Sequence, residues 1–403
     1  MIRIRRYLAV GAVVISALDV AAGVMPTIRS AKADPGDAVV AIAGADLSGT
    51  GPGSVISATT IPVFSNTEAG QRMRAARVVY RSTNGDTGQP TQVSGSVFVP
   101  LGEAPATGWP VIGFAHGTTG IDQPCAPSRS DTLGNHVYWV SRLVDLGFAV
   151  ALTDYEGLGN PGVHPYLDSP TAGYNVIDSV RALRQTFPHV SAVWAALGGS
   201  QGGGAAWAAD EEAAIYAPEL NLVGAGAWAP AADVVGLVDK ALAGTLTREQ
   251  SGLFAAVIES LARRHPDLNR DDYRHGAAVK YWDLLSTCSA GLEQQRTAAL
   301  SELGPRDLAA ATPLAADLLR SYLLRWALPK GKSSAPLSVV YGDRDEYIDP
   351  VWTVEALVRA CRVGGSIVWQ QQQGKGHGGL DVEPQLAWLG DRFSGKPAPN
   401  YCT

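Results

Sequence analysis

Short apolar runs dominate the pattern of hydrophobic and polar positions from residue 76 onward. "ARVVYRST" (76–83) and "VSGSVFVP" (93–100) have the length and the β-branched content of strands. "NGDTG" lies between them and is rich in residues that form turns. This spacing predicts an antiparallel hairpin. By contrast, residues 34–70 are rich in Gly, Ala, Ser and Pro, and we expect them to form an extended segment over the domain without a core element.

After Pro110 the pattern changes to apolar runs that alternate with helical stretches. The runs are "VIGFAHG", "FAVALTDY", "AVWAALGG", "LVGAGAWA", "LSVVYGD" and "SIVWQQQ". Helices are predicted between them, for example over 131–146, 175–187 and 202–217. Buried apolar strands that alternate with helices are typical of a parallel sheet. The sequence therefore predicts an α/β fold with a mostly parallel sheet that helices cover on both faces.

One long interval interrupts this alternation. Between "LVGAGAWAPA" and "PLSVVYGD" the chain has helical patterns such as "QSGLFAAVIESLARRH" and "LAADLLRSYLLRWAL", with little strand signal. The interval is too long for an ordinary connection in a compact domain. We therefore expect an inserted helical cap over 234–332. The core would then consist of two parts, 34–233 and 333–403, with 330–336 as the return linker.

Residues 1–33 have the pattern of a cleavable signal peptide. Three arginines precede the apolar run 7–18, and Ala31 and Ala33 offer a cleavage site after Ala33. The run is too short for a comfortable transmembrane span. The sequence therefore predicts a protein that is secreted or associated with the cell envelope.

Charge and cysteine content narrow the classes of partner and cofactor. Removing the five basic residues and one acidic residue of 1–33 changes the formal net charge from −6 to −10, which argues against nucleic acid as a partner. The remaining cysteines are Cys125, Cys288, Cys361 and Cys402. In an oxidising compartment an even number is typical of two disulfides, for which three pairings are possible. Because there is no CxxC or His–Cys cluster, we expect no metal and no other cofactor.

The segment "GGSQGGG" (198–204) places a single serine among glycines. In a chain of this composition the pattern GxSxG arises by chance roughly 0.3 times, so the neighbouring segments must show whether it marks a nucleophile. An apolar strand candidate precedes it and an Ala-rich helix candidate follows. A sharp strand-to-helix turn would expose the Ser200 hydroxyl, while Gly198 and Gly202 would keep strand and helix from clashing. The alternative is a Gly-rich turn with an incidental serine.

A serine nucleophile needs a base and a group that orients the base. In open parallel sheets such residues lie in loops after the carboxyl ends of strands. The loop "GDRDEYIDP" selects Asp345 as the acid. Asp343 and Asp349 are competitors, because loop acids are often turn formers, and Asp349 before Pro350 has the pattern of a helix N-cap.

His377, in "GKGHGG", is the candidate base. Among the seven histidines it alone follows both Ser200 and Asp345, and the order Ser, Asp, His is that of α/β-hydrolases. The alternative is an incidental surface histidine in a glycine loop. We expect the other histidines to be structural or surface groups: His116, His136, His164, His189, His265 and His275.

Acyl transfer at a serine also needs two donors for the developing oxyanion. One is expected to be the backbone N–H of Gln201. The other is expected from the loop "HGTTG" (116–120), where Thr119 is preferred and Thr118 is next. The alternative is that the glycines of this loop only turn the chain.

Five segments together resemble the secretory lipase family, which comprises α/β-hydrolases of yeasts and actinobacteria and includes the yeast lipase A type. They are "AHGTTGIDQPCAPS", "TDYEGLGNPGVHPYL", "GGSQGGGA", "YGDRDEYIDP" and "GHGG". The likeness covers about 60–395. It implies the α/β-hydrolase fold, a serine esterase or lipase, and a helical cap that shapes an acyl pocket.

The resemblance also assigns roles to single residues. It makes Ser200 the nucleophile, Asp345 the acid and His377 the base, and it puts Thr119 where the family has its second oxyanion donor. The yeast enzyme has an aspartate there, so this chain departs from it. The resemblance further implies a disulfide between the Cys125 region and the cap. On that basis we pair Cys125 with Cys288, and Cys361 with Cys402.

Three functional hypotheses follow. The first is a secreted serine esterase or lipase that hydrolyses carboxylic esters such as acylglycerols through an acyl-enzyme, with a lipid or small ester as substrate and a lipid interface as a further partner. The second is an acyltransferase of envelope lipids that uses the same triad and an alcohol in place of water. The third is a catalytically silent envelope-binding protein.

Overall fold

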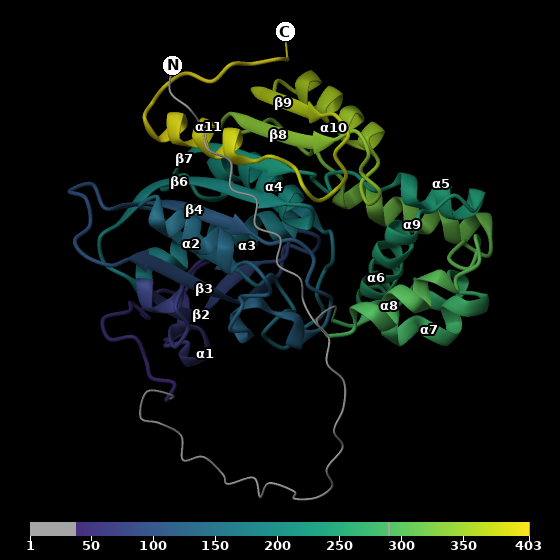
Figure 1. The fold of residues 1–403 in the computed structure, drawn as a ribbon, viewed down its shortest axis with the longest axis horizontal. Coiled ribbons are helices and arrows are strands. Elements are labelled where there is room, and N and C mark those ends of the chain that lie inside the picture. The colour runs from purple at the N-terminus through teal and green to yellow at the C-terminus, as the bar shows by residue number, and fades with distance from the viewer. Residues whose placement is uncertain (1–37, 289–290, 403) are drawn as a thin grey trace, which may run out of the picture. The chain divides into compact units, whose positions relative to one another are not determined.

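The structure is a computed structural model that describes residues 38–288 and 291–402. The predicted signal peptide lies outside the described residues. A nine-stranded sheet has the strand order β1-β2-β3-β5-β4-β6-β7-β8-β9 (Figure 1). Its first three strands and β5 are antiparallel neighbours. They are β1 (Val55–Thr59), β2 (Met73–Thr83), β3 (Pro90–Pro100) and β5 (Ala149–Thr153).

From β5 to β9 the neighbouring strands are parallel. Their carboxyl ends therefore meet at one edge of the sheet, where loops can gather side chains from distant parts of the chain. The remaining strands are β4 (Trp109–Ala115), β6 (Val190–Gly199), β7 (Asn221–Trp228), β8 (Leu337–Gly342) and β9 (Ile367–Gln372). The predicted hairpin is present as β2 and β3, paired from Met73–Pro100 to Thr83–Pro90.

Helices cover both faces of the sheet, as the unbroken apolar runs predicted. Along β4, Val111 and Ala115 belong to the core on one face, and Ile112 and Phe114 to the core on the other. The first face packs against α3 (Ser169–Thr186), α4 (Gln201–Tyr216) and α10 (Pro350–Arg362). The second packs against α2 (Val137–Asp145) and α11 (Glu383–Phe393).

Five helices lie between β7 and β8 and form a core of their own. Phe254, Ile258, Trp282 and Leu319 are among its buried residues. The helices gather beside the sheet (Figure 1). They are α5 (Gly236–Ala243), α6 (Arg248–Arg264), α7 (Gly276–Ser286), α8 (Glu293–Ser301) and α9 (Pro313–Trp326). The bounds 234–332 of an independent cap stay a prediction.

Two expectations about the N-terminal half were wrong. The segment 34–70 is not free of core elements, because it contains the short helix α1 (Pro62–Ser65) and the strand β1, whose Val55 is fully buried. The helix predicted over 131–146 begins only at Val137, since Leu133 and Asn135 have positive φ angles of 50° and 70° that no helix accommodates.

The helix expected over 175–187 begins earlier than predicted, at Ser169. The Asp168 carboxylate accepts the Thr171 N–H at 3.1 Å, and Pro170 lies in the first turn, where its missing N–H costs nothing.

None of the helices among residues 38–288 and 291–402 is long and apolar enough to span a membrane.

Candidate active site

Ser200 lies in the tight turn between β6 and α4. Its backbone angles, φ 58° and ψ −122°, are rare for a residue with a side chain. Two hydrogen bonds to the end of β7 hold it there: its N–H donates to the Trp228 carbonyl at 2.9 Å, and its carbonyl accepts from the Ala231 N–H at 3.0 Å. The turn is therefore fixed by the neighbouring strand, which is a feature of a preorganised nucleophile.

Glycines on both sides of Ser200 permit this turn. A Cβ atom at Gly202 would overlap the backbone carbonyl of Ala115, and one at Gly198 would overlap the backbone of Gly202. The strand and the helix therefore approach too closely for any side chain at these two positions. This agrees with the role that the sequence predicted for both glycines.

The structure brings together the three predicted triad residues. His377 Nε2 lies 2.8 Å from Ser200 Oγ, and His377 Nδ1 lies 2.7 Å from Asp345 Oδ2. Asp345 is buried, and its Oδ1 accepts the N–H groups of Tyr347 and Ile348 at 2.8 and 2.9 Å. With Nδ1–H donating to the carboxylate, Nε2 carries the lone pair that accepts the serine proton.

The two competing acids have other partners. Asp343 accepts the Gly374 N–H at 2.6 Å, and so it closes the loop that carries the histidine. Asp349 accepts the Val351 N–H at 3.2 Å as the N-cap of α10, the role that its position before Pro350 indicated. Of the three acids, Asp345 is therefore the one that contacts His377, and its role in catalysis stays a prediction.

The side chain of Gln201, which follows the serine, is fixed by His164, for which a structural or surface role was expected. Its amide Nε2 donates to His164 Nε2 at 2.9 Å, while His164 Nδ1 donates to the Glu156 carbonyl at 2.8 Å. Burial lowers the pKa of His164 to about 3, so its imidazole is neutral and can accept at Nε2. The segment "GVHPYL", which is part of the family resemblance, is the sequence feature that could have indicated a role for His164 near the site.

In the loop after β4, Thr118 lines the cavity, whereas Thr119 was the preferred candidate for the second oxyanion donor. Thr118 lines the cavity beside Ser200, and its Oγ1 lies 2.7 Å from Tyr166 Oη. The Thr119 hydroxyl is buried and has no hydrogen-bond partner in the described part of the chain. The Tyr155 hydroxyl donates to the His116 carbonyl at 2.9 Å and so holds the base of the loop. The identity of the second oxyanion donor stays a prediction.

A cavity of about 640 Å³ opens at the triad. Ser200, His377 and Tyr347 line it together with residues of α6 and α8. This volume is sufficient for a small ester or a short acyl chain.

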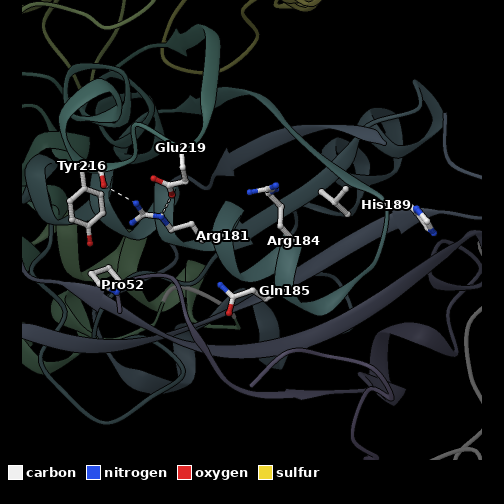
Figure 2. A pocket seen from close by; sticks show the side chains of 8 residues that line it. Pro52, Arg181, Arg184, Gln185, His189, Tyr216 and Glu219 are labelled. Atoms are coloured by element: carbon white, nitrogen blue, oxygen red, sulfur yellow. Dashed lines mark hydrogen bonds and ion pairs between the residues drawn. The ribbon is translucent and has the colours of Figure 1, made fainter. Parts of the chain in front are cut away.

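A second cavity, of about 560 Å³, lies near Val190, at the opposite end of β6 from Ser200 (Figure 2). Its Arg181 is already paired with Glu219 at 2.7 Å and donates to the Tyr216 carbonyl. The lining residues include no serine or cysteine beside its His189. The chemistry predicted from the sequence therefore belongs to the first cavity.

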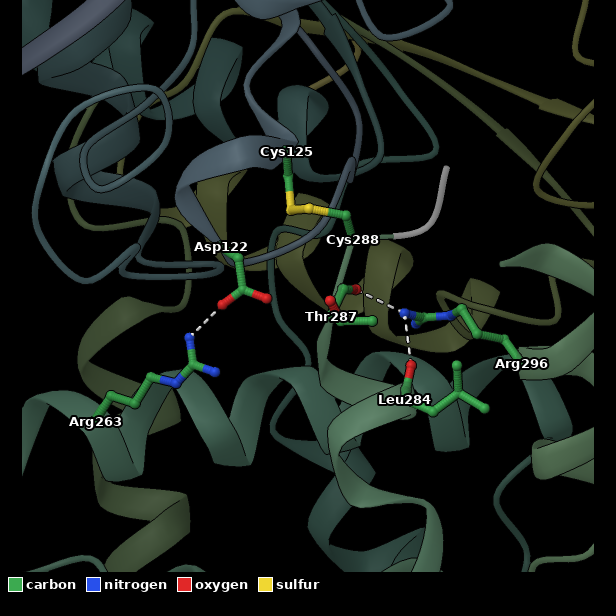
Figure 3. The surroundings of a disulfide bond; sticks show 7 residues. All are labelled: Asp122, Cys125, Arg263, Leu284, Thr287, Cys288 and Arg296. Atoms are coloured by element: carbon green, nitrogen blue, oxygen red, sulfur yellow. Dashed lines mark hydrogen bonds and ion pairs between the residues drawn. A yellow bond between two sulfur atoms is a disulfide. The ribbon is translucent and has the colours of Figure 1, made fainter. Parts of the chain in front are cut away.

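Both expected disulfides are present. Cys125–Cys288 links the loop after β4 to the end of α7 (Figure 3), and Cys361–Cys402 links α10 to the C-terminal segment. Asp122 lies near the first pair, as a metal ligand would. Because the two sulfurs are bonded to each other, this cluster cannot offer thiolates to a metal.

Comparison with known proteins places these features in a family. A model of the secretory lipases matches residues 126–400. A protein of Mycobacterium tuberculosis named a probable inactive lipase is 28% identical over 377 residues, which are 87% of this chain and 80% of that protein. Lipase 6 of Candida albicans is 25% identical over 311 residues, 69% of this chain and 65% of that protein.

Solved structures share the fold. Candida antarctica lipase A in its closed state has a TM-score of 0.70 at 16% identity, with 92% of this chain and 88% of that chain covered. The rice cell wall degrading esterase LipA of Xanthomonas oryzae has a TM-score of 0.65 at 20% identity, with 86% and 97% covered. The α/β-hydrolase fold is thereby established.

Proposed function

Since the chain belongs to the secretory lipase family, we propose that it is a secreted serine hydrolase of carboxylic esters that acts through Ser200, His377 and Asp345. The observation that carries this proposal is the continuous hydrogen-bonded path from the Asp345 carboxylate through the imidazole to the Ser200 hydroxyl. A solvated incidental serine has neither a base at 2.8 Å nor a strained backbone that holds it there.

The geometry supports acyl transfer in two steps. Ser200 Oγ attacks the ester carbonyl while His377 Nε2 takes its proton, and Asp345 stabilises the imidazolium that forms. The N–H of Gln201 and one N–H of the loop 116–120 stabilise the oxyanion. The alcohol leaves with the proton from His377, and an acyl-serine remains. Water then attacks the acyl-serine, gives its proton to His377, and releases the acid as Ser200 recovers its proton.

Two features favour export. Each described cysteine is in a disulfide, and disulfides persist in oxidising compartments. The predicted signal peptide 1–33 supplies the route. The proposal therefore includes action outside the cytoplasm, on a lipid or a small ester.

A catalytically silent protein is the second candidate, because one relative is named a probable inactive lipase. A fluorophosphonate probe separates the two, since it labels only an activated serine. Labelling at Ser200 is expected. Transfer to an alcohol in place of water would appear as new ester product when glycerol is added.

The decisive experiment measures hydrolysis of 4-nitrophenyl butyrate by purified protein. Ser200→Ala is expected to lower kcat by at least about 10³-fold, because the nucleophile is lost. Asp345→Asn is expected to lower kcat strongly through the wrong imidazole tautomer. Glu346→Gln removes an exposed carboxylate from the same loop and is the matched control, which should keep its activity. Full activity in Ser200→Ala would refute the proposal.

A further inference from the structure

The cavity beside Ser200 has a charged wall. Cavities that hold plain acyl chains are lined mainly by apolar side chains. Here, apolar residues of α6 and α8 share the wall with four charged ones: Arg248, Glu249, Glu293 and Arg296. Charged groups beside a reactive centre are costly to desolvate unless they are paired or serve a ligand.

These four charged groups differ in their partners. Arg248 and Glu249 pair with each other at 3.1 Å. The Glu293 carboxylate accepts the Gly291 N–H at 3.1 Å. Neither acid lies within 4.0 Å of the Arg296 guanidinium, which has no ion pair with any carboxylate in residues 38–288 and 291–402.

Arg296 is nevertheless held firmly. Its Nη1 donates to the carbonyls of Leu284 and Thr287 at 3.2 and 2.7 Å (Figure 3). Cys288, the next residue after Thr287, is tied to Cys125 by the disulfide. Two carbonyl bonds anchor one nitrogen without neutralising the charge, so Nη2 and Nε remain available as donors.

The position of Arg296 relates it to the triad. Arg296, Tyr166 and Tyr347 line the same cavity, and the ring centroid of Tyr347 lies 4.7 Å from that of the His377 imidazole. Burial lowers the pKa of Arg296 below its ordinary value, and the attraction of the Glu293 carboxylate offsets this only in part. A guanidinium in this state is suited to bidentate binding of a carboxylate.

We propose that Arg296 makes this cavity selective for esters whose acyl chain ends in a carboxylate, such as half-esters of short dicarboxylic acids. The inference rests on the proposed ester hydrolysis and names the substrate class of that same site. The carboxylate binds Arg296 while the ester carbonyl lies at Ser200, so the guanidinium, which has no ion pair among the described residues, gains one on binding.

The test compares esters of matched chain length. Ethanol release is measured from the monoethyl esters of succinic, glutaric and adipic acid and from ethyl butyrate, valerate and hexanoate. For at least one chain length, wild-type kcat/KM is expected to favour the anionic ester. Arg296→Met should lower the ratio of anionic to neutral kcat/KM by about tenfold or more, the effect of one charge-assisted hydrogen bond. Arg296→Lys keeps the charge and should keep part of the preference.

Arg306→Met is the matched control, since Arg306 is an exposed arginine in the turn after α8 and does not line the cavity. It removes the same net charge and should leave the ratio unchanged. The inference is overturned if the wild type hydrolyses the neutral esters without preferring the anionic ones. It is also overturned if Arg296→Met and Arg306→Met change the ratio of anionic to neutral kcat/KM equally.

If no ester of either series is hydrolysed, the proposed function fails instead. The affinity of the protein for monoethyl glutarate relative to ethyl valerate, measured by calorimetry, then decides the role of Arg296. Equal affinities, or a preference that survives in Arg296→Met, would overturn it.

Discussion

Removal of the disulfide Cys125–Cys288 is expected to lower both stability and activity. The two cysteines are 163 residues apart, so in the chain-entropy relation their cross-link stabilises the folded state by up to about 5 kcal/mol. The second disulfide joins cysteines 41 residues apart, and the same relation gives up to about 4 kcal/mol. Entropy alone therefore predicts two similar losses of stability.

The surroundings of the two disulfides predict different effects on activity. Cys288 follows Ser286 and Thr287, which line the cavity, and Thr287 also anchors Arg296 (Figure 3). The remaining link nearby, Arg263 to Asp122 at 2.7 Å, is partly exposed and contributes at most about 1 kcal/mol. Loss of this disulfide therefore removes the covalent link between the cavity wall and the loop after β4, which leaves this ion pair and the packing of Ile121 to hold them together.

The disulfide Cys361–Cys402 lies away from the cavity. Hydrogen bonds of Ile367 with Tyr401 and Asn400 still hold the C-terminal segment when it is removed. Its removal should therefore cost stability while kcat/KM stays unchanged.

The assay combines urea unfolding, followed by tryptophan fluorescence without reductant, with ester hydrolysis at a temperature where every variant is folded. The double variant Cys125→Ser/Cys288→Ser is compared with Cys361→Ser/Cys402→Ser. A drop in kcat/KM is expected only in the first. Unchanged kinetics in the first, or an equal loss in both, would refute the idea that Cys125–Cys288 holds the cavity wall.

Two further predictions concern the turn at Ser200 and its support. Gly202→Ala should destabilise the fold by at least about 1–3 kcal/mol, because its Cβ would overlap the Ala115 carbonyl. Gly390→Ala is the control: this glycine faces open space on α11, and the substitution should stabilise the fold by about 0.4–1 kcal/mol. Unfolding curves that rank the two variants the other way would contradict this. Burial lowers the pKa of His164 from 6.5 to about 3, so as the pH falls the unfolded chain binds a proton before the folded chain does. The stability that neutral His164 contributes is complete above pH 6.5. It is lost as the pH falls from 6.5 towards 3, at up to about 1.4 kcal/mol per pH unit. His164→Gln should therefore show a shallower fall in the free energy of unfolding over this range, and equal slopes would count against it.

Much of the fold could be predicted from local sequence. Strands β4 to β8 appear as short apolar runs, because residues buried on both faces of a sheet must be apolar at nearly every position. The order of Ser200, Asp345 and His377 follows from the loops after three such strands. Strand β1 was missed because it lies in a segment rich in Gly, Ala, Ser and Pro, and its pairing with β2 is a contact between distant parts of the chain. The delayed start of α2 was missed because the positive φ angles there are imposed by packing.

The sequence by itself determined the alternation of strands and helices and the residue types that the proposed chemistry needs, since periodicity and turn composition act over a few neighbouring positions. Only the tertiary structure decided which side chains meet. The contact of His377 with Ser200 joins residues 177 positions apart, and that of His164 with Gln201 joins residues 37 positions apart. That Arg296 has no ion pair among the described residues depends on where the carboxylates of other segments come to lie. Such relations arise from strand register and helix packing, which bring distant segments together and leave no trace in the local pattern of residues.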